Sequence, residues 1–179
     1  MKRAFVAIDL PAALKERLTS ATPPLPKGVR PVPPDQIHLT LRFLGNVDDA
    51  AFPVLVEALG KITAPAFAVR LDAPGTFPPT GEPHVLWMGL ADSEPLGQLR
   101  ARIDDAAFAA GLPRDDRPFS AHITIARLRD TRRKSITDVL EALAGLGPIE
   151  IPVPAFTLYT SVLTNTGATH TAERVYGLS

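Results

Sequence analysis

Two short stretches, His38-Leu39-Thr40-Leu41 and His122-Ile123-Thr124-Ile125, follow one pattern and lie 84 residues apart. In each, a histidine and a threonine alternate with two aliphatic residues. Because side chains at i and i+2 of a strand share a face, each stretch predicts a strand with a His-Thr pair on one face and aliphatic residues buried on the other. Buried polar pairs need partners, and a cleft between lobes provides that environment. We therefore expect the two motifs to line one cleft.

The elements around the two motifs follow in the same order when the chain is shifted by 84 residues. The opening at 5–18 falls on 89–102, and the long strands beginning at Ala66 and Glu150 coincide. This repetition predicts an internal duplication within one domain, residues 1–179, with two similar lobes facing each other. A proline-rich loop is expected at 22–35 and a turn at 165–167. The expected strands are 4–10, 37–44, 66–77, 85–90, 121–128, 149–163 and 169–176, and the expected helices are 12–20, 48–62, 95–110 and 135–144.

Composition excludes several classes of protein. The 179 residues contain 19 Lys+Arg and 19 Asp+Glu, which argues against a basic nucleic-acid coat. Without cysteine there are no disulfides, thiolate nucleophiles or Cys-ligated metal centres. The N-terminal apolar run ends at Asp9 and Pro11, too early for a secretory signal, and no stretch is long enough to span a membrane. We expect a soluble, cytoplasmic protein with no membrane partner.

Two imidazoles that face one site are suited to acid–base catalysis. A neutral histidine can take a proton from an attacking hydroxyl while a protonated one gives a proton to a leaving oxygen. The hydroxyls of Thr40 and Thr124 can donate to a phosphoryl oxygen. The pattern therefore favours displacement at a phosphodiester by His38 and His122, with neither metal nor cofactor. The near symmetry leaves open which histidine is acid and which is base.

The stretches 38–45 and 119–127 resemble the two signatures of the 2H phosphoesterases. Within that superfamily the chain is most similar to the RNA 2′,3′-cyclic phosphodiesterases, formerly called 2′-5′ RNA ligases (LigT/ThpR type). Residues 3–8 and 161–163, followed by Gly167, are also similar. The resemblance implies an α+β fold: two lobes related by a pseudo-twofold axis, each with a mainly antiparallel sheet and helices outside, around a central cleft.

The same resemblance implies metal-independent hydrolysis of a terminal RNA 2′,3′-cyclic phosphate to a 2′-phosphate. His38 would donate a proton to the leaving 3′-oxygen, and His122 would activate water. Run backwards with a 5′-hydroxyl RNA, the same site would form a 2′-5′ bond. Two alternatives stay open: a 2H enzyme for another cyclic phosphate, such as a nucleotide or an ADP-ribose derivative, and a noncatalytic module that binds RNA ends.

Residues beside the motifs are candidates for binding substrate. Arg42 follows His38 by four residues, so alternation predicts the same strand face, either at a phosphate or at an exposed cleft edge. Phe43 and Arg127 each follow their histidine by five, which sends them to the opposite face unless a bulge intervenes. The resemblance suggests that Phe43 stacks on a base and that Arg127 contacts the phosphate. By spacing alone, Phe43 is equally suited to the core.

The sequence assigns no role to several other polar residues. His84 and His170 each follow a Gly-x-x turn, and the family often has tyrosine near the position of His170. A four-histidine metal site is not expected, since His-x-Thr is not a ligand pair. The cluster 132–134 either holds an RNA backbone or forms a solvated start of a helix. We expect a monomer, because no exposed apolar stripe argues for a dimer.

Overall fold

The computed structural model describes residues 1–21, 23–164 and 167–179. Within them the chain forms one antiparallel sheet of nine strands in the order β7-β4-β5-β6-β3-β1-β8-β9, with β2 also paired to β6. The strands are β1 Lys2–Asp9, β2 Val29–Pro31, β3 His38–Val47, β4 Phe67–Phe77, β5 Val85–Leu90, β6 His122–Leu128, β7 Glu150–Val153, β8 Ala155–Thr164 and β9 Gly167–Gly177. The helices are α1 Ala12–Ser20, α2 Ala51–Gly60, α3 Glu94–Ala109 and α4 Thr137–Ala144, with short 3-10 turns η1 Pro34–Gln36 and η2 Arg133–Ile136.

The two motif strands, β3 and β6, are neighbours at the centre of the sheet. They pair antiparallel with Leu39 opposite Ile123, two residues that are themselves 84 positions apart. β1 flanks β3 on one side and β5 flanks β6 on the other. The expected α+β fold with antiparallel pairing is therefore confirmed, and the two halves of the molecule join edge to edge in one sheet.

The spatial halves differ from the sequence repeats in one respect. Strand β4, from the first repeat, pairs with β5 of the second repeat. Reciprocally, β8 of the second repeat pairs with β1 of the first. Each half of the sheet thus contains strands from both predicted repeats. That the repeats arose by duplication stays a prediction.

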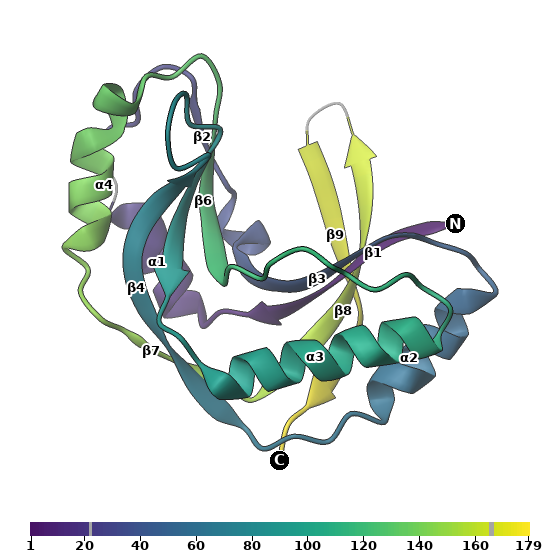
Figure 1. Cartoon of the computed structure of the whole chain (residues 1–179). Helices are drawn as coiled ribbons and strands as arrows, with labels where there is room; N and C mark the ends of the chain where they lie inside the picture. The colour runs from purple at the N-terminus through teal and green to yellow at the C-terminus, as the bar shows by residue number, and fades with distance from the viewer. Residues whose placement is uncertain (22, 165–166) are drawn as a thin grey trace.

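Helices cover the face of the sheet that carries the aliphatic motif residues. Leu39, Leu41, Ile123 and Ile125 are all buried, as the alternation predicts. Helix α3 packs on β3, α2 packs beside α3, and α4 lies along β4 (Figure 1). Helix α3 starts sharply because the Ser93 hydroxyl accepts a hydrogen bond from the Leu96 amide. The core therefore lies behind the motifs, and the His-Thr pairs occupy the other face.

Some expected boundaries were wrong. The strand expected at 149–163 breaks at Pro154, between β7 and β8, because proline has no N–H for the ladder. The segment expected to be an extended loop at 22–35 contains β2 and η1, although Thr22 lies outside the described residues. Asn165 and Thr166 of the expected turn also lie outside them. None of the described helices is long and apolar enough to cross a membrane.

Candidate functional site

The pairing of β3 with β6 brings the four motif side chains to one face of the sheet. With Leu39 opposite Ile123, the antiparallel register sets Thr40 beside His122 and His38 beside Thr124. All four polar side chains are half-buried, whereas the aliphatic residues between them are fully buried. The sheet therefore presents two imidazoles and two hydroxyls together, with access to solvent.

His122 is held by a backbone carbonyl and two aromatic rings. Its Nδ1 lies 2.7 Å from the carbonyl oxygen of Ser120. Since that carbonyl can only accept, Nδ1 carries the proton and Nε2 of the neutral ring is left as an acceptor. The Phe77 ring meets the imidazole edge-on at 4.9 Å, and Trp87 lies 6.3 Å away. These contacts fix the orientation of the ring.

His38 lies in a larger aromatic cluster on the other side of the centre. Its ring stacks on Phe5 with the centroids 5.0 Å apart, and Tyr159 lies parallel at 6.2 Å. His170, from β9, meets His38 edge-on at 5.7 Å. The structure thus brings one of the two unassigned histidines to the motif. Residue spacing could not predict this contact, because it depends on the pairing of β1 with β8 and of β8 with β9.

Burial sets the protonation of His38. Burial first, and then repulsion from His170, lower the pKa of this imidazole from 6.5 to about 4. The nearby Asp9 carboxylate and the backbone carbonyl of Gln36 oppose the shift. Gln36 precedes His38 by two residues, as Ser120 precedes His122, so each imidazole has a carbonyl at the same sequence spacing. Without a ligand, His38 is neutral at pH 7.

A carboxylate with two hydroxyl partners lies beside this cluster. Asp9, at the end of β1, accepts hydrogen bonds from the Thr157 hydroxyl at 2.8 Å and from the Tyr159 hydroxyl. Burial and the bond to Asp9 raise the pKa of Tyr159. The network fixes the Tyr159 ring parallel to Phe5, at 5.1 Å. Nothing in the sequence singles out this network, because Asp9 reads as no more than the polar end of an apolar strand.

Both motif strands carry an irregularity just after the threonine. In β3, Thr40 and Arg42 oppose successive residues of β1, which leaves Leu41 without a partner. In β6, Thr124 and Ala126 oppose successive residues of β5, which leaves Ile125 without one. A bulge of this kind shifts the alternation by one residue. The two bulges lie at positions 84 residues apart, so both strands turn in the same way.

Arg42 is a correction to the sequence analysis. The bulge buries it directly after Leu41, on the opposite face from His38, and only 5% of its surface is exposed. Its Nε lies 3.0 Å from Asp104 Oδ1, and its Nη1 lies 3.1 Å from Asp115 Oδ2. The expected position beside the histidines was therefore wrong. Arg42 instead ties β3 to α3 and to the loop that contains Asp115.

The same bulges expose Phe43 and Arg127. Phe43 is 54% exposed, and its ring lies 6.2 Å from Phe5, on which His38 stacks. Arg127 is exposed at the matching point of β6. The condition that a bulge must intervene is met at both positions. Both side chains thus leave the strands on the face of the histidines, where they are free to meet a ligand.

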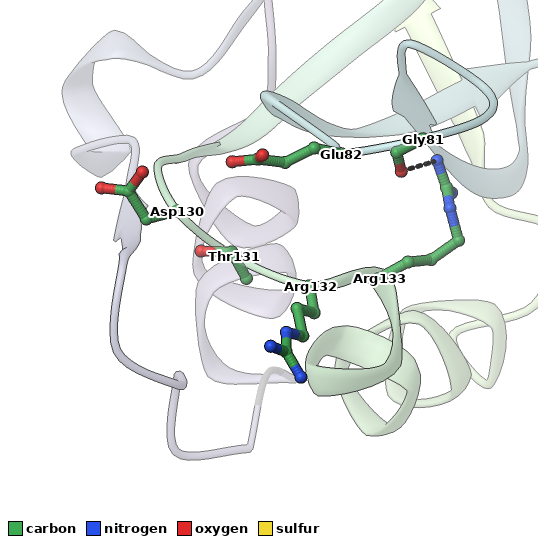
Figure 2. A pocket seen from close by; sticks show the side chains of 6 residues that line it. All are labelled: Gly81, Glu82, Asp130, Thr131, Arg132 and Arg133. Atoms are coloured by element: carbon green, nitrogen blue, oxygen red, sulfur yellow. Dashed lines mark hydrogen bonds between the residues drawn. The ribbon is translucent and has the colours of Figure 1, made fainter.

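The basic cluster at 132–134 is partly used within the protein. The Arg133 guanidinium donates to the Thr76 hydroxyl at 2.7 Å and to the carbonyls of Pro78 and Gly81. Figure 2 shows this side chain reaching across to the 78–81 loop while Arg132 points away from it. A pocket of about 480 Å³ lies here, away from the histidines, lined by Gly81, Glu82, Asp130, Thr131, Arg132 and Arg133. Its carboxylates oppose the binding of an anion.

His84 is exposed just before β5, and among the described residues its ring has no contact with the other histidines. Within the described parts of the chain, no group of three or more His, Asp or Glu side chains is arranged to hold a metal ion.

The sequence of this chain matches a known protein family. The model of the 2′-5′ RNA ligase superfamily matches residues 9–164, a range that contains both motif strands. The RNA 2′,3′-cyclic phosphodiesterase of Thermus thermophilus is 36% identical, with 98% of this chain and 90% of that protein covered. The protein of the same name from Archaeoglobus fulgidus is 29% identical, with 97% and 99% covered.

Solved structures agree with these matches. The structure of Escherichia coli LigT complexed with 3′-AMP matches with a TM-score of 0.78 at 29% identity, covering 99% of this chain and 98% of that one. The structure of TT0787 from T. thermophilus matches with a TM-score of 0.79 at 30% identity, covering 98% and 97%. Sequence and fold thus agree over nearly the whole length, and the chain belongs to the 2′-5′ RNA ligase superfamily.

Proposed function

We propose that this protein hydrolyses the 2′,3′-cyclic phosphate at the end of an RNA to a 2′-phosphate, with His38 and His122 as its acid–base pair and without a metal ion. The observation that carries the proposal is the pairing of Leu39 with Ile123, which puts both His-Thr pairs on one accessible face. Relatives named RNA 2′,3′-cyclic phosphodiesterase support the reaction.

The proposed reaction is an in-line displacement at phosphorus. Nε2 of neutral His122 takes a proton from water, and the water oxygen forms a bond to phosphorus. The bond from phosphorus to the 3′-oxygen breaks, and His38 gives that oxygen its proton. The products are a 2′-phosphate and a 3′-hydroxyl. Thr40 and Thr124 donate to the nonbridging oxygens, where negative charge is held during the displacement.

The acid role of His38 requires the substrate. At pH 7 the free protein holds this imidazole neutral, since burial lowers its pKa to about 4. A phosphodiester anion beside the ring would favour the imidazolium and raise the pKa towards neutrality. Hydrolysis by this route therefore predicts that substrate binding and proton uptake by His38 are linked. The tautomer that the Ser120 carbonyl selects already suits His122 to accept a proton.

Ligation would use the same site with a different nucleophile. The 5′-hydroxyl of a second RNA would take the place of water, give its proton to His122 and form a bond to phosphorus, while the bond to the 3′-oxygen breaks and His38 protonates that oxygen. The product would be a 2′-5′ phosphodiester, and this activity needs no further catalytic residue. It depends on whether a second RNA end can reach the face of β3 and β6. We also propose that the active form is a monomer, which light scattering tests directly.

The experiment uses a short RNA with a 2′,3′-cyclic phosphate end, incubated with the protein in excess EDTA. The product is separated and its terminal phosphate is located at the 2′ or the 3′ position. A 2′-phosphate supports loss of the 3′-oxygen by the proposed route. A 3′-phosphate, or a requirement for metal, contradicts it. Binding without turnover would favour a noncatalytic module for RNA ends.

A small cyclic nucleotide is the second candidate substrate. E. coli LigT was solved with 3′-AMP, a mononucleotide, and its chain matches this one over nearly its full length. Turnover of 2′,3′-cyclic AMP in the same assay, with the RNA left intact, would favour this candidate. Comparing kcat/KM for the two substrates separates the proposals.

A further inference from the structure

We propose that Arg30 and Arg127 together bind two consecutive phosphates of the RNA chain, with Arg127 nearer the reacting phosphate and Arg30 at the phosphodiester next to it. This inference rests on the proposed function and adds the part of the RNA that is recognised beside the reacting group, namely the phosphodiester next to the cyclic phosphate. Arg30 lies on β2, a strand that the sequence did not predict.

The two arginines lie directly opposite each other across β2 and β6. The next pair along the ladder, Val29 opposite Leu128, is buried on the core side. Since side chains alternate, Arg30 and Arg127 leave the strands together on the other face, and both are exposed. Neighbouring strands are about 4.8 Å apart, so the two guanidinium groups can reach adjacent phosphates.

Like charges directly opposite each other destabilise a sheet unless an anion lies between them. Among the described residues, neither Arg30 nor Arg127 has an ion pair or a side-chain hydrogen bond. Asp130, the acidic residue nearest to Arg127 in the sequence, lies beside Arg129, with its Oδ2 3.8 Å from Nε of Arg129. The repulsion between the two arginines is therefore left unrelieved in the free protein, which favours an anionic ligand.

This pair continues the row of catalytic candidates along β6. Arg127 lies three residues beyond Thr124, which is roughly 10 Å of strand before the bulge shortens it. The chain that carries Arg30 follows β6 back towards the site, since the Val32 amide donates to the Ile125 carbonyl at 2.8 Å. The reacting phosphate would thus lie between Thr124 and Arg127, and the next phosphate of the RNA would lie at Arg30. The RNA backbone would then run in one direction across the sheet.

The test compares two substrates, 2′,3′-cyclic AMP and a trinucleotide that ends in a 2′,3′-cyclic phosphate. Only the trinucleotide has a phosphodiester for Arg30. The variant is Arg30→Ala, with Arg30→Lys to retain the charge. Arg17→Ala is the matched control, because Arg17 is an exposed arginine on α1 outside the proposed site.

We expect the wild type to prefer the trinucleotide by about tenfold in kcat/KM, the size of one charge-assisted contact. Arg30→Ala should remove this preference through KM and leave cyclic AMP unaffected. The slope of log KM for the trinucleotide against log salt should change by about 0.7, the value for one phosphate contact on a single strand. Arg30→Lys should retain most of the wild-type dependence of log KM on log salt, because it keeps the positive charge. Arg17→Ala should alter neither KM nor its salt dependence.

Two results overturn the inference while the proposed function survives: equal use of both substrates by the wild type, or an equal effect of Arg30→Ala on both. Failure to hydrolyse either substrate contradicts the proposed function instead. Thermal unfolding gives an independent readout. Because Arg30→Ala removes the repulsion, it should raise the midpoint of the free protein, and added trinucleotide should protect the wild type more than the variant. A lowered midpoint contradicts the repulsion.

Discussion

Arg42 leaves β3 on the core face, and Phe43 leaves it on the face of His38. Arg42 is 5% exposed and paired with Asp104, whereas Phe43 is 54% exposed on the face of His38. The bulge at Leu41 causes this arrangement, since regular alternation would reverse both positions. One strand thereby contributes an ion pair to the core and an aromatic ring to the candidate site.

Removing the buried guanidinium should strongly destabilise the protein. Arg42→Ala leaves Asp104 and Asp115 facing each other without their shared partner, and we expect the free energy of unfolding to fall by about 3–5 kcal/mol. Urea denaturation measures it. The control is Arg117→Ala, because Arg117 also pairs with Asp115 but is 70% exposed. That exposed pair should contribute at most about 1 kcal/mol. Equal losses for the two variants would contradict the buried role of Arg42.

Removing the exposed ring should affect the substrate rather than the fold. Phe43→Ala should weaken binding of an RNA end by roughly 1–3 kcal/mol, the contribution of one stacked base. Because the ring is half exposed, the free energy of unfolding measured by urea denaturation should change little. Phe108→Ala is the matched control, since Phe108 is 55% exposed on α3 and pairs with Arg114. A rise in KM for both variants alike would exclude stacking at Phe43.

The sequence predicted the faces of the motif residues because alternation in a strand is a local property. Leu39 and Ile123 are fully buried, whereas His38 and His122 lie on the other face and are only half-buried, as expected. Arg42 was misplaced because a bulge depends on the partner strand, which residue spacing does not reveal. The contact of His170 with His38 was missed for a similar reason. It follows from the pairing of β1 with β8, which lie more than 100 residues apart, and of β8 with β9.

The two histidines should be separately essential. His38→Ala or His122→Ala should lower kcat/KM for the cyclic-phosphate RNA by about 10²–10⁴-fold, the usual contribution of one positioned acid or base. His84→Ala is the control, since His84 is an exposed histidine away from the motif face. Circular dichroism establishes that each variant is folded. Wild-type rates in both motif variants would refute the mechanism.

Lowering the pH should destabilise the protein through His38. The unfolded imidazole binds a proton near pH 6.5, whereas the folded one does so only near pH 4. Between these values the unfolded state holds more protons, so the free energy of unfolding falls as the pH falls. The contribution of His38 to the free energy of unfolding is fully present above pH 6.5. By pH 4, about 3 kcal/mol of it is lost.

Urea denaturation from pH 8 to pH 4 measures this dependence. His38→Gln should remove most of the slope, because glutamine does not titrate. His84→Gln is the matched control for replacing a histidine, because His84 is exposed. His170 adds a slope in the same direction, since burial lowers its pKa as well. A slope of the same size in wild type and His38→Gln would show that His38 is not the group that titrates.

Adding a side chain at Gly75 should disturb the candidate site, because it displaces the Trp87 ring. A Cβ on Gly75 would clash with the indole of Trp87, so the ring must move. Trp87 lies 6.3 Å from His122, and its displacement should lower kcat while destabilising the fold by about 1–3 kcal/mol. The chain has one tryptophan, so its fluorescence reports the movement directly.

Gly97→Ala is the control, because Gly97 lies in α3 with open space around its Cβ. That change should leave the fluorescence unchanged and stabilise the helix by up to about 1 kcal/mol. If Gly75→Ala shifts the fluorescence but leaves kcat intact, then Trp87 packs against His122 without orienting it.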